Sequence, residues 1–275
     1  MRTDGVALRV VALAYLAGLL VLPLAMVFAT AFKDGPAPVL AAVSRPAAVS
    51  AMLLTVGIAL VAVVANTIVG VWCAVQLVRG RFPGKALLNA LIDLPFAISP
   101  VVVGLALLAV YGRAGWWGGW LIEHGLPVIF SVPGMVLATA FVSLPFVVRE
   151  VVPVLRELGT EQEQAAATLG ASSLQILWRV TLPSIRRAIA YGVVLTTARA
   201  LGEFGAVSVV SGRLAGRTQT LTLYVEERFQ GFDVTGAYTA SIVLALLALL
   251  TLVLMRRLAL TPGLSLSQRE REQPA

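Results

Sequence analysis

The sequence is poor in charged residues, cysteine and histidine. Charged residues make up 13% of its 275 positions, against roughly 25% in soluble domains, while 59% of the residues are hydrophobic. Cys73 alone can form no internal disulfide, and a single histidine, His124, supports no Cys/His metal cluster. The shortage of charge excludes an ordinary soluble domain and indicates an integral membrane protein.

Motifs of two enzyme classes are also missing. No G-x-x-x-x-G-K-[ST] pattern occurs, so the chain has no P-loop with which to hydrolyse ATP. No serine lies in a G-x-S-x-G elbow and the one histidine falls in a loop, which argues against an intramembrane hydrolase. The sequence therefore predicts a protein that is not an enzyme, and ATP-driven work would need a separate subunit.

Long apolar runs dominate the chain, and a membrane span needs about 20 mostly apolar residues. Six segments qualify, at 7–32, 52–78, 87–111, 130–151, 186–211 and 235–255. The first contains the cleavage-like pattern Ala29-Thr30-Ala31, but its apolar run exceeds the 7–15 residues, roughly, of the apolar region of a signal peptide, so we expect a retained span. The predicted fold class is all-α, a polytopic membrane protein with about six transmembrane helices.

Lysine and arginine are distributed unevenly between the two sides of these spans. With the N-terminus placed inside, fourteen fall on the inner side, six on the outer side and Arg199 within the membrane. Because basic residues concentrate on the cytoplasmic side, we predict that both termini are cytoplasmic. The net charge of +7 is thus explained without nucleic-acid binding. Residues 1–260 are expected to form the transmembrane domain, with a cytoplasmic loop at 159–183 and a disordered cytoplasmic tail at 261–275.

Residues 161–183, EQEQAAATLGASSLQILWRVTLP, interrupt the apolar pattern on the cytoplasmic side. Residues 161–177 are rich in helix formers. Thr160 followed by Glu163 fits a capping box at the start of a helix, and Gly170 is expected to end or bend it. The sequence therefore predicts a short cytoplasmic helix.

The residues on the surface of this helix indicate whether it binds lipid or another protein. A helix that lies on lipid has a basic face, but residues 161–177 contain no lysine or arginine. Ala166 and Gly170 lie four positions apart, and with Ala165 they form a surface without bulk. We therefore expect the helix to dock in a groove of another protein, with lipid binding as the less favoured alternative.

The loop resembles the cytoplasmic signature of the permease subunits of ABC importers, which reads Glu-Ala-Ala, three residues, Gly, nine residues and Ile-x-Leu-Pro. The matching positions are Ala165, Ala166, Gly170, Leu182 and Pro183. Gln164 stands at the place of the motif's glutamate, with Glu163 one position earlier, and Val180 replaces isoleucine. The resemblance implies a type I ABC importer permease in a bacterial cytoplasmic membrane. It also implies that the loop is the coupling helix, that a separate ATPase subunit uses the ATP, and that this chain binds no cofactor.

Two further stretches narrow the resemblance. DLPFAISPVVVGL in the third span and ARALGEFGAVSVVSG in the fifth resemble the sulfate/thiosulfate importer permeases, and the second is most similar to their W-type subunit. Permeases for molybdate and tungstate share RALGEFGA and remain the alternative. An ion-coupled secondary transporter is less favoured, because it would show paired broken helices and LPFAISP has no second copy. The resemblance implies three partners: an ATPase subunit, a homologous second permease and an extracytoplasmic sulfate-binding protein.

Pro95, Ser99 and Pro100 interrupt the third span. Each proline removes a backbone donor, and a broken helix at membrane depth is tolerated where neighbours or a cavity satisfy the freed groups. We expect these residues to border the translocation path or its gate, with a simple packing kink as the alternative. Asp93 is expected near the cytoplasmic interface, in contact with water.

Arg199 and Glu203 place charges inside the fifth predicted span. A charge at the bilayer centre costs at least about 2.5–3.5 kcal/mol, so the two are expected to face a partner or a wet path. They either form a structural ion pair or border the path, where Arg199 would attract a divalent anion and Glu203 would hold the arginine between turnovers. Ala198, Gly202 and Ala206 recur every four residues and predict a ridge for close helix packing.

Overall fold

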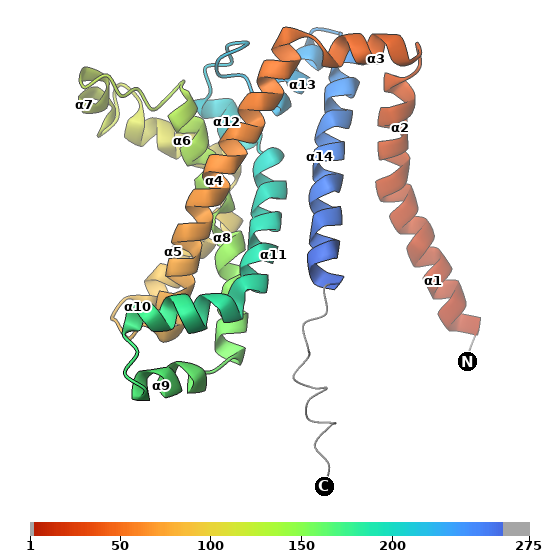
Figure 1. Ribbon diagram of the computed structural model, residues 1–275. Helices are drawn as coiled ribbons and strands as arrows, with labels where there is room; N and C mark the ends of the chain where they lie inside the picture. Colours follow the sequence, from red (N-terminus) through yellow and green to blue (C-terminus); the bar gives the residue numbers. More distant parts are fainter. Residues whose placement is uncertain (1–2, 261–275) are drawn as a thin grey trace. The chain divides into compact units, whose positions relative to one another are not determined.

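A computed structural model describes residues 3–260, which are helical almost throughout (Figure 1). The α-helices are α1 Thr3–Leu16, α2 Leu22–Ala31, α3 Pro36–Val43, α4 Pro46–Arg79, α5 Lys85–Ala97, α6 Pro100–Tyr111, α7 Gly118–Glu123, α8 Val132–Glu157, α9 Glu161–Thr168, α10 Ser173–Ile176, α11 Leu182–Leu201, α12 Gly205–Val210, α13 Leu221–Gln230 and α14 Val234–Leu260; the π-helical turns are η1 Ala17–Val21 and η2 Leu177–Thr181. No strand occurs in this range, so the predicted all-α fold class is confirmed. The tail predicted to be disordered, 261–275, lies outside the described residues.

Four helical stretches in the described part of the chain are long and apolar enough to cross a membrane. They are Leu8–Ala31, Pro46–Arg79, Val132–Glu157 and Val234–Thr251. A fifth candidate is the pair α5 and α6, which is bent by 115°. The predicted span 186–211 is instead divided into α11 and α12 by a break at 202–204. The polytopic membrane protein is therefore supported, while the predicted count of six spans is not confirmed.

The chain folds as two compact units. The first contains the described residues up to Thr55 together with Gly212–Leu246. The second contains Val56–Ser211 together with the described residues from Leu247 onward. Every residue predicted for the coupling loop or for the translocation path lies in the second unit.

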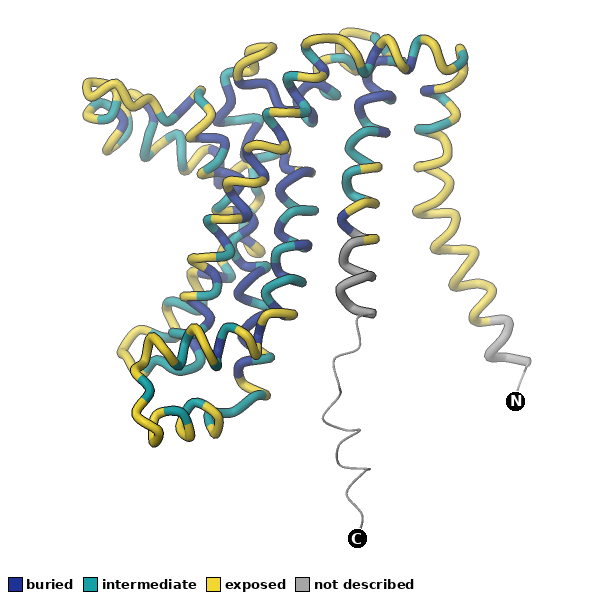
Figure 2. Tube along the Cα trace, in the orientation of Figure 1, coloured by how far each residue is buried: buried dark blue, intermediate teal, exposed yellow. Residues whose placement is uncertain are grey.

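Helix α8 forms the centre of the second unit. Val147, Val148 and Val151 are fully buried and pack against apolar residues of α4, α5 and α11. A Cβ on Gly192 of α11 would lie 2.9 Å from the Cα of Val147, and one on Gly70 of α4 would lie 2.9 Å from the Cβ of Val147. Figure 2 shows the buried positions along these helices. Small residues at such contacts let helix backbones approach closely, as membrane helices require.

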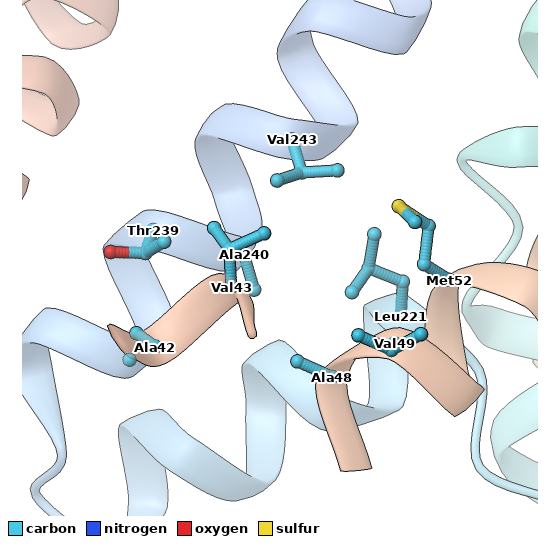
Figure 3. Close-up of a pocket in the computed structure, with 10 residues that line it drawn as sticks. Ala42, Val43, Ala48, Val49, Met52, Leu221, Thr239, Ala240 and Val243 are labelled. Carbon is cyan, nitrogen blue, oxygen red and sulfur yellow. The ribbon is translucent and has the colours of Figure 1, made fainter. Parts of the chain in front are cut away.

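The first unit has a small apolar core between α3, the start of α4, α13 and α14. Leu221 and Tyr224 of α13 are buried, and the Leu221 amide donates a hydrogen bond of 2.8 Å to Thr55 Oγ1. A gap of about 20 Å³ lies in this core. Figure 3 shows its lining residues, among which Thr239 supplies the only hydroxyl. A gap of this size holds about one water molecule at most. It is a packing gap and offers no cluster of donors for an anion.

An ion pair fixes the start of α4 and of α14 in the first unit. Arg45 pairs with Asp233, whose Oδ1 also accepts a hydrogen bond of 2.9 Å from the Gly236 amide. Burial acts to raise the pKa of the Asp233 carboxyl, but the hydrogen bonds from Arg45 and Gly236 outweigh burial and lower this pKa below its ordinary value. The hydrogen bond to Asp233 raises the pKa of the Arg45 guanidinium. Both groups therefore stay charged at neutral pH.

Candidate functional site

The predicted loop helix exists as α9, but its N-terminus differs from the prediction. The Thr160 side chain accepts no capping hydrogen bond from the backbone. Gln164 instead donates from Nε2 to Thr160 Oγ1 at 3.0 Å. The predicted capping box of Thr160 and Glu163 is therefore wrong. The physical reason is that the Glu163 carboxylate binds two side chains outside the helix.

Glu163 ties α9 to the helices of the second unit. Arg79, the last residue of α4, donates from Nε to Glu163 Oε2 at 2.9 Å. The Thr181 hydroxyl donates to Glu163 Oε1 at 2.9 Å. Figure 1 shows α9 and α10 at one end of this unit, where α8 also ends. Sequence patterns could not find these contacts, because Arg79 lies 84 residues from Glu163 in the chain.

Gly170 ends α9 because of its backbone conformation. Its φ is +86°, a left-handed value that side chains with a Cβ rarely adopt. The Ala171 amide donates to the Ala166 carbonyl at 3.1 Å and closes the helix end. A Cβ at Gly170 would meet nothing within 4 Å. Of the two predicted outcomes, an ending or a bend, the structure shows the ending.

A capping box does occur at the next helix, α10. The Ser172 amide donates to Gln175 Oε1 at 2.8 Å, and the Gln175 amide donates to Ser172 Oγ at 3.4 Å. The sequence signal for this start is a serine followed three residues later by glutamine. It separates α9 from the helical stretch that runs through η2 into α11.

The loop presents exposed side chains around the signature positions. Gln164, Ala165, Gly170 and Pro183 are exposed, while Ala166 and Leu182 are half-buried. The apolar side chains Leu169, Leu174 and Trp178 are 89%, 65% and 65% exposed. The structure thus places the residues of the loop motif together on one loop, close to the solvent-exposed apolar side chains of Leu169, Leu174 and Trp178. Docking of this loop into another protein stays a prediction.

The interruption of the third predicted span lies at Ile98–Ser99. Pro95 is buried inside α5, which continues to Ala97. Pro100 is the first residue of α6, where no backbone donor is needed. A residue before proline is extended, and Ser99 has ψ 136°. The break is therefore set by Pro100, and the Ser99 side chain makes no capping hydrogen bond.

Arg199, in the last turn of α11, forms an ion pair with Glu203, which lies in the break between α11 and α12. Arg199 Nη1 lies 2.7 Å from Glu203 Oε2, and the Glu203 side chain is only 2% exposed. Glu203 Oε1 accepts a hydrogen bond of 2.8 Å from the Ala206 amide at the start of α12. The ion pair weighed as one alternative is thus present, and Glu203 also fixes the start of α12. Whether the pair also borders the path stays a prediction.

The prediction that Ala198, Gly202 and Ala206 form a ridge on one face of a single helix is wrong. Helix α11 ends at Leu201, Gly202 is exposed, and Ala206 is buried on α12. The helix ends with Gly202 as its C-cap, before the ridge is complete. A sequence pattern of period four cannot reveal such an ending.

The two interrupted helices contact each other in the second unit. A Cβ on Gly205 would lie 3.0 Å from Pro100 Cβ, and one on Gly104 would lie 2.8 Å from the Ala206 carbonyl oxygen. The starts of α6 and α12 therefore lie together, beside the Arg199–Glu203 pair. The first amide groups of a helix have no carbonyl partner within it, and the N-terminus of α6 is the positive end of a helix dipole.

Asp93 is not simply solvated, contrary to the prediction. Arg149 of α8 donates from Nε to Asp93 Oδ1 at 2.7 Å. Arg149 also donates from Nη2 to Asn89 Oδ1 at 3.1 Å. These bonds tie α5 to α8 just before the break. The partner was missed because it lies 56 residues away in the chain.

These features define a class of protein, a polytopic helical membrane protein with interrupted helices and an exposed helical loop. The family described as "Binding-protein-dependent transport system inner membrane component" matches residues 66–260. The chain therefore belongs to this family of membrane transport permeases.

Two relatives come from Escherichia coli (strain K12). The "Sulfate transport system permease protein CysW" is 51% identical over 236 residues, which cover 86% of this chain and 81% of the relative. The "Sulfate transport system permease protein CysT" is 43% identical over 204 residues, which cover 74% of each chain. Both are named as permeases, so the chain is a transporter subunit rather than an enzyme.

A solved structure shares the fold. It is described as "Crystal structure of bacterial alginate ABC transporter in complex with alginate pentasaccharide-bound periplasmic protein". The match has a TM-score of 0.76 at 17% identity and covers 92% of this chain and 93% of that chain. The predicted ABC transporter permease fold is therefore confirmed.

Proposed function

We propose that this chain is the membrane-spanning subunit of an ATP-driven importer that carries sulfate and thiosulfate by alternating access. The CysW and CysT relatives, both named as sulfate transport permeases, support the substrate. The observation that carries the coupling role is α9, an exposed helix with the Ala165–Gly170 surface, in a chain of the binding-protein-dependent family. Molybdate or tungstate is the second candidate, on the shared stretch RALGEFGA.

Three partners complete the proposed importer. A separate ATPase receives α9 and moves it, because this sequence has no P-loop. A CysT-like chain is the second permease, since Escherichia coli has relatives of both names. A binding protein delivers the anion from outside, as the periplasmic protein in the description of the structural neighbour suggests for this fold. Both termini then lie in the cytoplasm of a bacterium, as the lysine and arginine distribution predicts.

The anion path is proposed to run beside the two helix breaks. Arg199 supplies positive charge, and its side chain is 29% exposed. The start of α6, where Ser99 is exposed and Pro100 is half-buried, is the positive end of a helix dipole, which favours an anion. Pro95 lies in the last turn before this break. Glu203 neutralises Arg199 when no anion is present, so the arginine carries no uncompensated charge in the membrane.

Sulfate uptake is expected to require this chain. Labelled sulfate uptake is measured in cells that contain the ATPase, the second permease and the binding protein, with and without this chain. Sulfate uptake should be lost without the chain. In its presence, thiosulfate should inhibit sulfate uptake, and trace molybdate should not. Unchanged sulfate uptake together with lost molybdate accumulation would instead assign molybdate as the substrate.

A bulky residue at Gly170 is expected to uncouple transport while the protein stays in the membrane. Gly170→Trp places a large side chain where the structure has open space, so it can clash only with a docked partner. Gly170→Ala is the matched control, because it imposes the same left-handed backbone strain of about 1–2 kcal/mol without bulk. We expect uptake to fall about tenfold further in the tryptophan variant than in the alanine variant. Equal uptake by both variants would refute docking at this position.

A further inference from the structure

Within the part of the chain that the structure describes, helix α9 contributes no residue to an apolar core. None of its residues, Glu161–Thr168, is buried. A helix that passes force from an ATPase to membrane spans needs firm attachment to those spans. The bonds that attach α9 are polar, and they converge on Glu163.

Both carboxylate oxygens of Glu163 are used, each toward a different element. Oε2 accepts from Arg79 Nε at 2.9 Å, and Oε1 accepts from the Thr181 hydroxyl at 2.9 Å. Arg79 also donates from Nη2 to the carbonyl of Gly159, two residues before α9 begins. The Arg79 and Glu163 side chains are each 20% exposed, and Thr181 is buried. Such sheltered, charge-assisted bonds are stronger than pairs fully open to water.

The three side chains come from three different elements. Arg79 ends α4, Thr181 ends η2 where α11 begins, and Glu163 lies in the first turn of α9. Gly159 follows α8 by two residues and has a left-handed φ of +62°. A displacement of α9 therefore acts at once on the end of α4 and on the start of α11.

We propose that Arg79, Glu163 and Thr181 form the mechanical link through which α9 moves α4 and α11. Arg79 is the positioning residue of this link, because it holds both the Glu163 carboxylate and the Gly159 turn. The proposal rests on the proposed function, in which α9 is the coupling helix. Without the link, α9 follows the ATPase while the spans do not, so ATP is consumed without import.

The test uses the whole importer in proteoliposomes with its binding protein, and it measures both sulfate import and ATP hydrolysis. The variants are Arg79→Ala, Glu163→Gln and the double change. We expect import to fall about tenfold while hydrolysis stays within about twofold, because charge-assisted bonds are lost but the docking face is kept. Sulfate import by the double variant should be no lower than import by either single variant, since each of the three variants breaks the same link. Arg79→Lys, which keeps the charge, should recover part of the import.

Two controls distinguish loss of this link from the effect of removing any nearby charge and from loss of the ATPase. Arg81→Ala and Glu157→Gln change exposed charges close in sequence to the link, and both should import as the wild-type chain does. The ATPase is quantified in each purified complex. An unchanged number of ATP molecules hydrolysed per sulfate in Arg79→Ala would overturn the link, and so would loss of the ATPase from that complex. Failure of the wild-type complex to import sulfate would instead reject the proposed function.

Discussion

Glu203→Ala is expected to reduce sulfate uptake by at least about a hundredfold, since removing one partner of a buried ion pair costs roughly 3–5 kcal/mol. The change removes two bonds together. Arg199 loses its carboxylate at 2.7 Å, and the Ala206 amide at the start of α12 loses its acceptor at 2.8 Å. The measurement is labelled sulfate uptake per assembled complex, with the complex quantified after purification.

Two further variants separate the structural from the transport role of this pair. Glu203→Gln keeps an acceptor for the Ala206 amide but removes the charge that balances Arg199. Arg199→Ala keeps Glu203 and the start of α12 but removes the positive charge from the proposed path. Impaired uptake by a fully assembled Arg199→Ala complex supports a role in the path. Loss of assembly alone, with normal uptake by the remaining complex, leaves Arg199 as a structural partner only.

The helical class and several span positions could be predicted because their causes are local. Apolar run length predicts spans such as Leu8–Ala31, close to the predicted 7–32. Helix formers predict α9, and the steric restriction before proline explains the break at Ser99. These signals act within a few residues, so one sequence is enough to detect them.

The polar contacts could not be predicted because their partners are distant in the chain. The local pattern predicts a capping box for the carboxylate of Glu163, but Arg79 competes for this carboxylate from another helix. The same reason explains the unforeseen bond between Asp93 and Arg149. A local rule gives the wrong partner when a tertiary ion pair is stronger than the local bond.

The close contacts between helices at single glycines also could not be predicted from the sequence. Gly192 and Gly104 look like ordinary apolar-span glycines, yet each lies against a neighbouring backbone. The predicted ridge has a spacing of four residues on one helix. The actual close contact joins α6 to α12, which are separate helices, so no single-helix pattern could reveal it.

Gly104→Val is expected to prevent accumulation of folded protein. A Cβ at this position would lie 2.8 Å from the Ala206 carbonyl oxygen and 2.8 Å from Val209 Cβ. Overpacking usually costs about 1–3 kcal/mol, and here one clashing atom belongs to the backbone, which cannot move to a new rotamer. Gly104→Ala introduces the same Cβ with less volume and should show a smaller loss of the same kind.

The matched control is Gly57→Val, because Gly57 lies on α4 of the same unit and an added Cβ would meet nothing within 4 Å. The measurement is the amount of monodisperse protein extracted in detergent, followed by its thermal unfolding. Gly57→Val should resemble the wild-type chain, since it changes helix propensity without creating a clash. Normal accumulation and normal uptake by Gly104→Val would show that α6 and α12 do not approach this closely. The proposed anion path would then lose its geometric basis, because that contact brings the start of α6 beside Arg199 and Glu203.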